Sequence, residues 1–521
     1  MKSRVKRSIN QAAPGSTGLA MPSLLASSGT AVVQAILGDE RLRQRVLELE
    51  QSVQVTVDPR TRSGVRLKSM RGRIYEVPLD SLRPDETALS DSVEALRRTG
   101  LEIVRIGRFG VTVRGPARLV AEILAIPLSV SAISRPDATR ATRMFSGAVD
   151  APRPNDLFVA PRESLSIDGS RVHPAINDFV FIPPPLLLAT AADAPSVGYL
   201  HADAAMLRKV MRMPAPADKN GGLTGKGVRV AMVDSGFDTS HPFYATRAFD
   251  FKAVSTNVAP NADKDSNGHG TAMAWNILAM ASECQLRGYR YDEPGSAMED
   301  AATGGASVIS CSWGYDREQV FPQIETSIRS VIEDDGAIVL FAAGNGQQCW
   351  PACMPSVIAV GGVYANPKTL DLEASDFASG FRSNLYLQRM VPDVSGLCGS
   401  SPYGIYFPLP VPAGCEMDQS LGGKPFPDKD ETKTDDGWVY ARGTSSATPQ
   451  VAGIVALMVQ HARSKGKSLT LTQARDCLMK SAQAVEKGRN AFGFPAVGNP
   501  NVAVGWGLVD VGAALHQVDL L

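Results

Sequence analysis

The 521-residue sequence predicts an α/β fold with a mostly parallel sheet, preceded by a smaller α+β domain. From Val228 onward, short β-branched runs alternate with helical stretches, as in a parallel sheet with helices on both faces. Between Arg73 and Ile133, strand and helix signals follow the order β-α-β-β-α-β. Hydrophobic residues make up 44% of the chain and charged residues 20%, so a sizeable core can form and global disorder is excluded.

The smaller domain consists of short elements with start and stop signals. We expect strands at residues 73–79, 102–106, 111–113 and 128–133, and helices at residues 90–99 and 116–125. Gly100 ends the first helix and Pro116 begins the second. This order is that of a split βαβ, ferredoxin-like domain, although many unrelated proteins share it.

Three regions complete the expected organisation. Residues 1–70 form an N-terminal extension, in which apolar residues from Thr30 to Glu50 recur at helical spacing. Residues 71–194 hold the α+β domain and a proline-rich segment ending in Phe179–Ala192, which we expect to be an extended linker or tail because it contains three consecutive prolines. Residues 195–521 form the larger α/β domain, with an insertion around 399–438.

Charge, cysteine content and hydropathy limit the function classes. The net charge is zero, which argues against a dedicated nucleic-acid binder, although the first 190 residues are net basic and the remainder net acidic. Seven cysteines without a CxxC spacing favour free thiols over disulfides or a metal site. No stretch of 18 strongly apolar residues occurs, so we expect no membrane span. The basic start is followed by a run broken by Pro and Gly, so a cytoplasmic location is favoured and secretion is the alternative.

Four motifs in the second half carry candidate chemistry. Asp234 ends a buried strand before a glycine turn, and His269 lies between two glycines at the start of an apolar helical stretch. Ser445 lies at the head of another apolar helix, where the helix amino terminus favours a developing oxyanion. Asn345 follows a strand on a glycine-flanked loop and could donate to such an oxyanion. Taken singly, each residue also fits a helix cap, a turn or a core position.

The order Asp, His, Ser with a glycine-flanked Asn resembles the subtilisin-like serine proteases. The resemblance covers about residues 195–521 and includes further segments of this sequence, namely Val308–Gly314, Trp350–Gly361, Pro392–Val394 and Gly505–Asp510. It implies a subtilisin-like, doubly wound α/β fold and hydrolysis of peptide bonds in protein or peptide substrates.

The resemblance also implies a role for each residue. Ser445 would be the nucleophile, His269 the general base and later the general acid, and Asp234 the group that orients the imidazole. Asn345 and the Ser445 amide would form the oxyanion hole, where losing a side-chain donor costs on the order of 100–1000-fold in rate. The substrate would pair with the backbone of Ser312, Trp313 and Gly314, and Ala343 and Gly344 would wall the primary specificity pocket.

Some positions depart from the family pattern. Ala272 and Gln450 replace common histidines, and Trp275 stands where glycine is usual, so local packing must differ. The insertion is either a substrate-selecting flap or a solvated surface loop, and its proline and acidic content favours the loop. Phe243 follows Ser240-His241-Pro242, and Ile277–Leu286 is short and apolar, so we expect no calcium at the family's usual site, and no other metal or cofactor.

The N-terminal half fits the small inhibitory prodomain of many secreted relatives. If its tail enters the active-site cleft as an added strand, self-cleavage should fall within Leu186–Ser196, with Met211–Asn220 as a second, less favoured window. Two other hypotheses remain open. One is a catalytically silent, peptide-binding scaffold. The other is an enzyme restricted to one dedicated partner protein, which the N-terminal region would dock.

Overall fold

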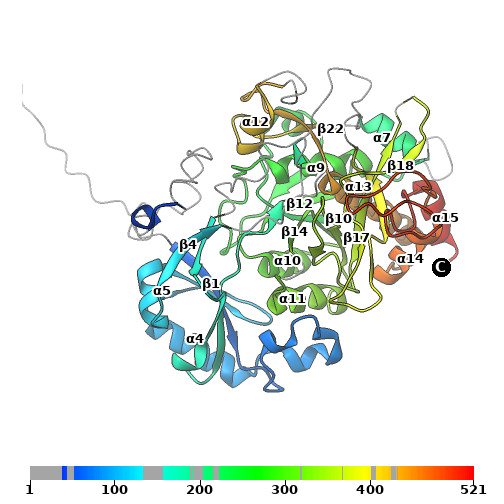
Figure 1. Cartoon of the computed structure of the whole chain (residues 1–521). Helices are drawn as coiled ribbons and strands as arrows, with labels where there is room; N and C mark the ends of the chain where they lie inside the picture. Colours follow the sequence, from blue (N-terminus) through cyan, green and yellow to red (C-terminus); the bar gives the residue numbers. More distant parts are fainter. Residues whose placement is uncertain are drawn as a thin grey trace, which may run out of the picture.

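The larger domain contains one eight-stranded sheet (Figure 1). The computed structural model describes residues 38–43, 52–132, 157–187, 190–191, 203–214, 222–316, 319–366, 368–400, 407–423, 430 and 432–521. The sheet runs in the order β11 (Asp250–Ala253), β12 (Gln285–Arg290), β10 (Arg229–Asp234), β13 (Val308–Cys311), β15 (Ile338–Ala342), β17 (Ile358–Ala365) and β18 (Leu372–Ala374), and β21 (Val394–Leu397) also pairs with β17. Its pairings are parallel except that of β17 with β18, so the prediction of a mostly parallel sheet is confirmed.

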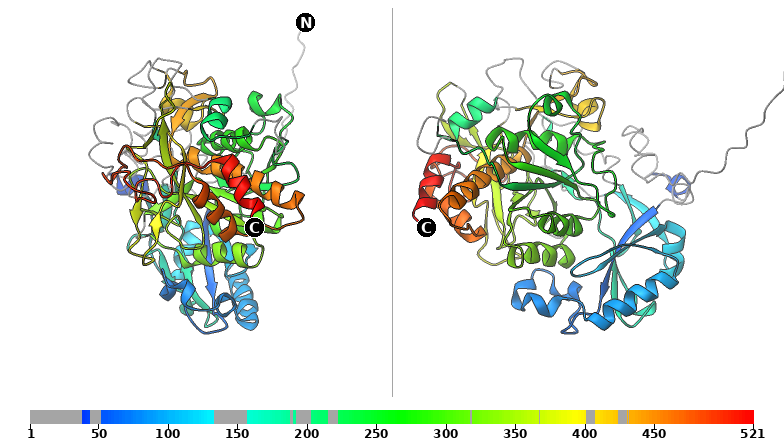
Figure 2. Two further views of the ribbon diagram at one scale, coloured as in Figure 1. Left: turned by 90° about the vertical axis from the view of Figure 1, so that its right-hand side faces the viewer. Right: turned by 180° about the vertical axis from the view of Figure 1, so that it is seen from behind.

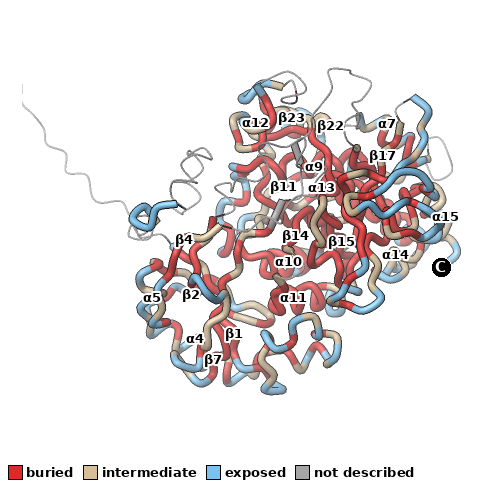
Figure 3. The backbone as a smooth tube through the Cα atoms, in the orientation of Figure 1, coloured by how far each residue is buried: buried red, intermediate tan, exposed pale blue. Residues whose placement is uncertain are grey.

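Two pairs of helices cover this sheet. Helices α9 (His269–Met280) and α13 (Thr444–Ser464) pack against each other, as do α10 (Pro294–Thr303) and α11 (Pro322–Glu333), and the pairs lie on opposite sides of the sheet (Figure 1). Every residue of α9 is buried, which matches its apolar character all around the helix. The buried backbone is concentrated in the central strands and these helices (Figure 3).

Shorter elements complete the larger domain. The helices are α7 (Ala204–Val210), α8 (Pro242–Ala245), α12 (Glu416–Leu421), α14 (Leu471–Ser481) and α15 (Val511–Asp519). The strands are β14 (Trp313–Asp316), β16 (Cys349–Trp350), β19 (Phe381–Arg382), β20 (Met390–Val391), β22 (Phe407–Pro410) and β23 (Trp438–Arg442). Within the described ranges, no helix is both long enough and apolar enough to cross a membrane.

The smaller domain has a five-stranded antiparallel sheet. Its order is β2 (Glu102–Ile106), β3 (Val111–Pro116), β1 (Ser52–Pro59), β7 (Ile176–Val180) and β6 (Ser166–Asp168). Helices α4 (Glu86–Arg98) and α5 (Ala117–Leu124) pack on it, and β4 (Leu128–Ala132) pairs separately with β5 (Leu157–Pro161). The two helices and the strands at 102–106, 111–116 and 128–132 lie where the sequence predicts them.

Several expectations for this half are wrong. The segment expected as a strand at 73–79 forms the 3₁₀ turns η2 (Ile74–Glu76) and η3 (Leu79–Leu82), since Pro78 has no amide hydrogen for a strand ladder. The first strand is instead β1, which lies in the expected N-terminal extension, so a boundary at residue 71 falls inside one folded unit. The place next to β1 that a ferredoxin-like sheet would give to residues 128–133 is taken by β7. Residues 157–180, expected to belong to a linker, supply β5, β6 and β7.

Other expectations concern segments that the structure describes only in part. The predicted helix from Thr30 to Glu50 lies outside the described residues apart from 38–43. The expected tail after Val180 is not free of the larger domain, because its short strands β8 (Leu186–Leu187) and β9 (Thr190–Ala191) both pair with strands of that domain.

Two further 3₁₀ turns, η1 (Leu67–Met70) and η5 (Gly169–Arg171), belong to the smaller domain.

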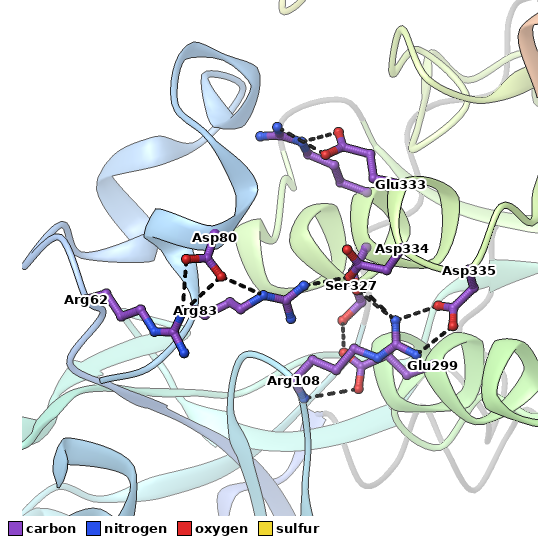
Figure 4. A network of polar contacts seen from close by, with 11 residues as sticks. Arg62, Asp80, Arg83, Arg108, Glu299, Ser327, Glu333, Asp334 and Asp335 are labelled. Atoms are coloured by element: carbon purple, nitrogen blue, oxygen red, sulfur yellow. Dashed lines mark hydrogen bonds and ion pairs between the residues drawn. The ribbon is translucent and has the colours of Figure 1, made fainter. Parts of the chain in front are cut away.

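The two domains meet through opposite charges (Figure 4). Arg83 pairs with Asp334 at 2.6 Å, Arg108 with Asp335 at 2.5 Å, and Arg105 with Glu299 at 2.8 Å. The arginines come from the smaller domain, and the carboxylates come from α10 and from the turn that follows α11. Here the net basic first part of the sequence meets the net acidic second part, and Figure 2 shows the smaller domain seated below the two helices.

A buried pair of carboxyl groups also lies at this interface. Asp58 of β1 and Asp178 of β7 face each other across the ladder, and both are fully buried. Gln323 of α11 donates to Asp58 Oδ2 at 2.5 Å, and Lys68 donates to Asp178 Oδ1 at 3.2 Å. Burial, together with the facing Asp178, raises the pKa of Asp58 to about 8, although Gln323 and Lys68 oppose the rise.

Candidate active site

Asp234 and His269 form a buried hydrogen-bonded pair. Asp234 is the last residue of β10, and His269 is the first residue of α9. Asp234 Oδ1 lies 2.7 Å from His269 Nδ1 and also accepts the amide of Ser235 at 2.8 Å. The Asp234 side chain is completely buried and that of His269 almost completely. An acceptor on Nδ1 keeps the proton on that nitrogen and leaves Nε2 as the basic atom.

Glycine on either side of the histidine allows this approach. Gly268 has φ of +95°, a left-handed conformation that ends the preceding loop and lets the helix start at His269. A Cβ on Gly270 would lie 2.2 Å from the carbonyl oxygen of Gly236, in the loop after Asp234. The first turn of α9 therefore rests directly on the aspartate loop.

Asp265 is a supporting residue that the sequence analysis missed. Its Oδ1 accepts from the Gly268 amide and the Ser235 hydroxyl, both at 2.8 Å. Its Oδ2 accepts from the amide and the hydroxyl of Thr271 at 2.9 and 2.7 Å. One buried carboxylate thus ties the loop after Asp234 to both sides of His269. The signal for it was weak, because an acidic residue in a polar loop is common.

Ser445 is the second residue of α13, and its helix packs on that of His269. Ser446 contacts Met273 Sδ at 3.8 Å, and a Cβ on Gly453 would lie 2.8 Å from Met280 Cβ. Ser445 Oγ donates to the Ser312 carbonyl at 3.1 Å, and Ser312 Oγ donates to the Ser445 carbonyl at 2.9 Å. Among the described residues, none bonds the buried His269 Nε2. A proton transfer from Ser445 to His269 requires its hydroxyl to turn from Ser312, and such bonds are often loose before substrate binds.

Asn345 is held at the amino terminus of the same helix. Its Oδ1 accepts from the amide and the hydroxyl of Thr444, both at 3.0 Å. These two bonds fix the orientation of the Asn345 side-chain amide, so that its Nδ2 donor faces away from Thr444. Gly344, with φ of +116°, lies so close to Cys349 that a Cβ would be 2.8 Å from Sγ. Ala343 and Gly344 are thus packed beside Asn345, and Ala343 is fully buried.

The predicted substrate strand has a chain segment beside it. β8 pairs antiparallel with β14, with Leu187 opposite Trp313 and Leu186 opposite Gly314. β9 pairs with β23, with Thr190 opposite Arg442, two residues before α13 begins. The Trp313 side chain itself is fully buried and donates to the Val233 carbonyl at 2.7 Å, so Trp313 offers this segment its backbone alone.

Comparison with known proteins identifies the family of this site. The family model described as the subtilase family matches residues 225–507, more than half of the chain. The chain belongs to the subtilase family. The subtilisin of Bacillus pumilus is 28% identical over 303 residues, covering 52% of this chain and 90% of that protein. Subtilisin E of Bacillus subtilis (strain 168) is 28% identical over 325 residues, covering 55% and 71%.

A solved structure supports the same fold. Fervidolysin from Fervidobacterium pennivorans, a keratinolytic enzyme related to subtilisin, matches with a TM-score of 0.50 and 15% identity. The match covers 90% of this chain, so it extends beyond residues 225–507, but it covers only 61% of the fervidolysin chain. The subtilisin-like fold and the assignment to a family of serine proteases are thereby confirmed.

The described part of residues 399–438, the segment predicted to be an insertion, contacts the loop before His269. The amides of Glu416 and Met417, at the start of α12, donate to the carbonyls of Ser266 and Asn267 at 3.0 Å. Asn267 Nδ2 donates to Glu416 Oε2 at 2.8 Å. In β22, Phe407 and Leu409 are fully buried. The interpretation as a solvated loop is therefore wrong for the described part of residues 399–438, because its apolar side chains alternate into the core.

The departures from the subtilase pattern are accommodated by this packing. Trp275 lies against Phe407 of the insertion, with ring centroids 5.9 Å apart. Gln450 is buried, and its amide bonds both the N–H and the carbonyl of Leu397 at 3.0 Å and Asn276 at 3.1 Å. Ala272 is buried without a polar partner to satisfy. None of these residues contacts Asp234, His269 or Ser445 through a recorded polar bond.

Metal binding was expected to be absent. Within the ranges that the structure describes, no three His, Cys, Asp or Glu side chains are grouped as a metal site would require. Six of the seven cysteines lie in the larger-domain core or on the insertion and one on α14, and all seven are free and buried. Burial raises the pKa of Cys284, Cys353 and Cys398 to about 12, so these thiols stay protonated and unreactive near neutral pH.

Proposed function

We propose that this subtilase is a serine endopeptidase in which Ser445, His269 and Asp234 act as the catalytic triad. The observation that carries the proposal is the buried 2.7 Å bond between Asp234 and His269. His269 lies on α9, which packs against α13, the helix of Ser445. His269 Nε2 takes the proton of Ser445 as its oxygen attacks the substrate carbonyl, and Asp234 stabilises the imidazolium that forms. His269 then protonates the leaving amine. In the second half of the reaction, it takes a proton from the water that attacks the acyl-enzyme and returns it to the Ser445 oxygen as the acid product leaves.

Asn345 and the Ser445 amide are proposed to bind the oxyanion. The Nδ2 donor of Asn345 is oriented by Thr444, which directly precedes the nucleophile. The helix dipole of α13 adds to the field at this point. A catalytically silent scaffold is the weaker alternative, since no member of the triad has been replaced.

Labelling with a fluorophosphonate tests this proposal. Incubation of the self-processed protein with such a probe, followed by peptide mass mapping, should place the adduct on Ser445. The Ser446→Ala variant should be labelled like the wild type, whereas Ser445→Ala and His269→Ala should not be labelled. Efficient labelling at another serine, or equal labelling of His269→Ala, would contradict the assignment.

The N-terminal domain is proposed to act as an intramolecular inhibitor. The segment after Val180 pairs with β14 on one side of Ser445 and with β23 on the other, as a bound substrate would. The arginine contacts to α10 and α11 hold the domain that delivers this segment. A dedicated partner for the N-terminal region and a cytoplasmic location remain predictions.

The domain interface should weaken as pH rises. Asp58 has a raised pKa of about 8 in the folded protein and an ordinary pKa near 4 in the unfolded chain. At any pH between about 4 and 8, folding therefore takes up a proton at this carboxyl group. Stability is therefore lost as pH rises from about 4 to 8, by roughly 2 kcal/mol between pH 6 and pH 8 for this group. Glu325, whose pKa burial raises to about 7, adds to the loss.

Chemical denaturation of the Ser445→Ala chain at pH 6 and pH 8 measures this effect. Adding Asp58→Asn should remove about 2 kcal/mol of the pH dependence and leave the part due to Glu325. Asp91→Asn, which changes an exposed aspartate of α4, serves as the control and should leave the dependence unchanged. An unchanged pH dependence in Asp58→Asn would show that the Asp58 carboxyl does not hold its proton at this interface.

A further inference from the structure

The hydroxyl of Tyr315 contacts the inhibitory segment ahead of its paired strand. Tyr315 belongs to β14 and is fully buried, and its hydroxyl donates to the carbonyl of Pro183 at 3.1 Å. Pro183 lies three residues before Leu186, the residue that pairs with Gly314. The contact therefore extends recognition of the segment beyond the two residues of β8.

The chemistry of the segment explains why a side-chain donor is used. Pro183, Pro184 and Pro185 have no amide hydrogen, so this run can offer only carbonyl acceptors. A strand ladder cannot continue along it, and β8 begins only at Leu186, directly after the prolines. A donor from the protein can still bind such a run, as in other sites that recognise extended proline-rich chains.

The position of this donor is fixed by its surroundings. The Tyr315 ring packs against Phe321, Trp313 and Trp350, with centroids 5.0, 6.1 and 5.8 Å away. A phenol buried among aromatic rings cannot turn its hydroxyl towards solvent, so it needs an acceptor within the protein or its ligand. Pro183 and Pro185 are both buried there.

We propose that Tyr315 is a substrate-binding residue that selects peptides with a proline-rich, extended segment ahead of the strand-pairing residues. This inference rests on the peptidase function proposed above. Because prolines already hold such a segment extended, its binding costs less conformational entropy than that of a flexible peptide. The proline run cannot donate to the carbonyls of β14, and Tyr315 instead binds it through a donor to the Pro183 carbonyl.

Two fluorogenic peptides test the proposal with the enzyme that the full-length chain yields by self-processing. One carries residues 181–192 and the other residues 184–192, which lacks the Pro183 carbonyl. Tyr315→Phe keeps the ring and removes the hydroxyl, so kcat/KM for the longer peptide should fall about three- to tenfold, with little change for the shorter one. The matched control Tyr289→Phe, whose hydroxyl lies near Gly304, should leave both peptides unaffected.

Each other outcome is decisive. An equal loss on both peptides would mean that Tyr315 only supports the groove, which overturns the proposal. Equal cleavage of the two peptides by the wild type would also overturn it. A longer peptide with alanine at 183–185 should be cleaved more slowly than the proline peptide, and equal rates would refute the preference for proline. Cleavage of the short peptide shows that the peptidase function itself stands, whereas cleavage of neither peptide removes the basis of both proposals.

Discussion

Replacing His269 with alanine should lower kcat/KM for the 181–192 peptide by on the order of a million-fold. The Ser445 hydroxyl is a poor nucleophile at neutral pH, and His269, bonded to the buried carboxylate of Asp234, lies on the helix packed against that of Ser445. Without the imidazole, neither the attack of Ser445 nor the protonation of the leaving amine has a proton carrier. Steady-state hydrolysis of the peptide, with purified variants, measures the loss.

Two further variants separate catalysis from folding. Asp234→Asn keeps the shape of the pair but favours the wrong tautomer of His269, and should cost on the order of ten-thousand-fold. His461→Ala removes another buried histidine that pairs with a carboxylate, Asp519 at 2.8 Å, far along α13 from Ser445. This control should stay within a few-fold of the wild type. A loss in His461→Ala as large as that in His269→Ala would point to general misfolding instead of catalysis.

The parts of the fold that were predictable depend on local patterns. The strands β10, β13, β15 and β17 coincide with runs of buried β-branched residues, and α9 and α13 with apolar stretches that begin after glycine. The motifs of the proposed triad could be recognised in the sequence because each places a reactive residue at the end of such an element. Their mutual approach, with Asp234 2.7 Å from His269, follows from the parallel sheet that brings these ends together.

The parts that were missed depend on contacts between distant segments. Val53, Val55 and Val57 of β1 alternate with polar residues, which is a strand pattern, but only pairing with β3 and β7, far along the chain, makes this segment the centre of a sheet. The insertion packs because Phe407 meets Trp275, more than one hundred residues earlier in the chain. Asp265 ties the histidine loop to the aspartate loop only through Ser235, a residue 30 positions earlier whose approach no local pattern encodes.

Self-cleavage between Leu187 and Thr190 is the second large effect that we expect. β8 pairs with β14, which follows the Ser312 that Ser445 contacts, and β9 pairs with β23, which ends three residues before Ser445. Only Leu188 and Ala189 separate β8 from β9 in the sequence. This interval lies inside the window predicted from the sequence, Leu186–Ser196. Intact-mass measurement of the wild-type chain should therefore show two fragments divided within it, while Ser445→Ala stays a single chain.

The second window, Met211–Asn220, is the informative contrast for this experiment. Met211 is fully buried, and its carbonyl accepts the amide of Val511 at 2.9 Å, so the start of this window is tied to the C-terminal helix α15 and not to the groove. Cleavage there in both the wild type and Ser445→Ala would come from another protease acting on a loop.

The Ser446→Ala variant should process like the wild type, because it leaves Ser445 and its Ser312 contacts in place. A full-length chain that hydrolyses peptides without being cut would refute the inhibitory role of the segment, since β8 and Ser445's substrate would then need the same edge of β14 at once.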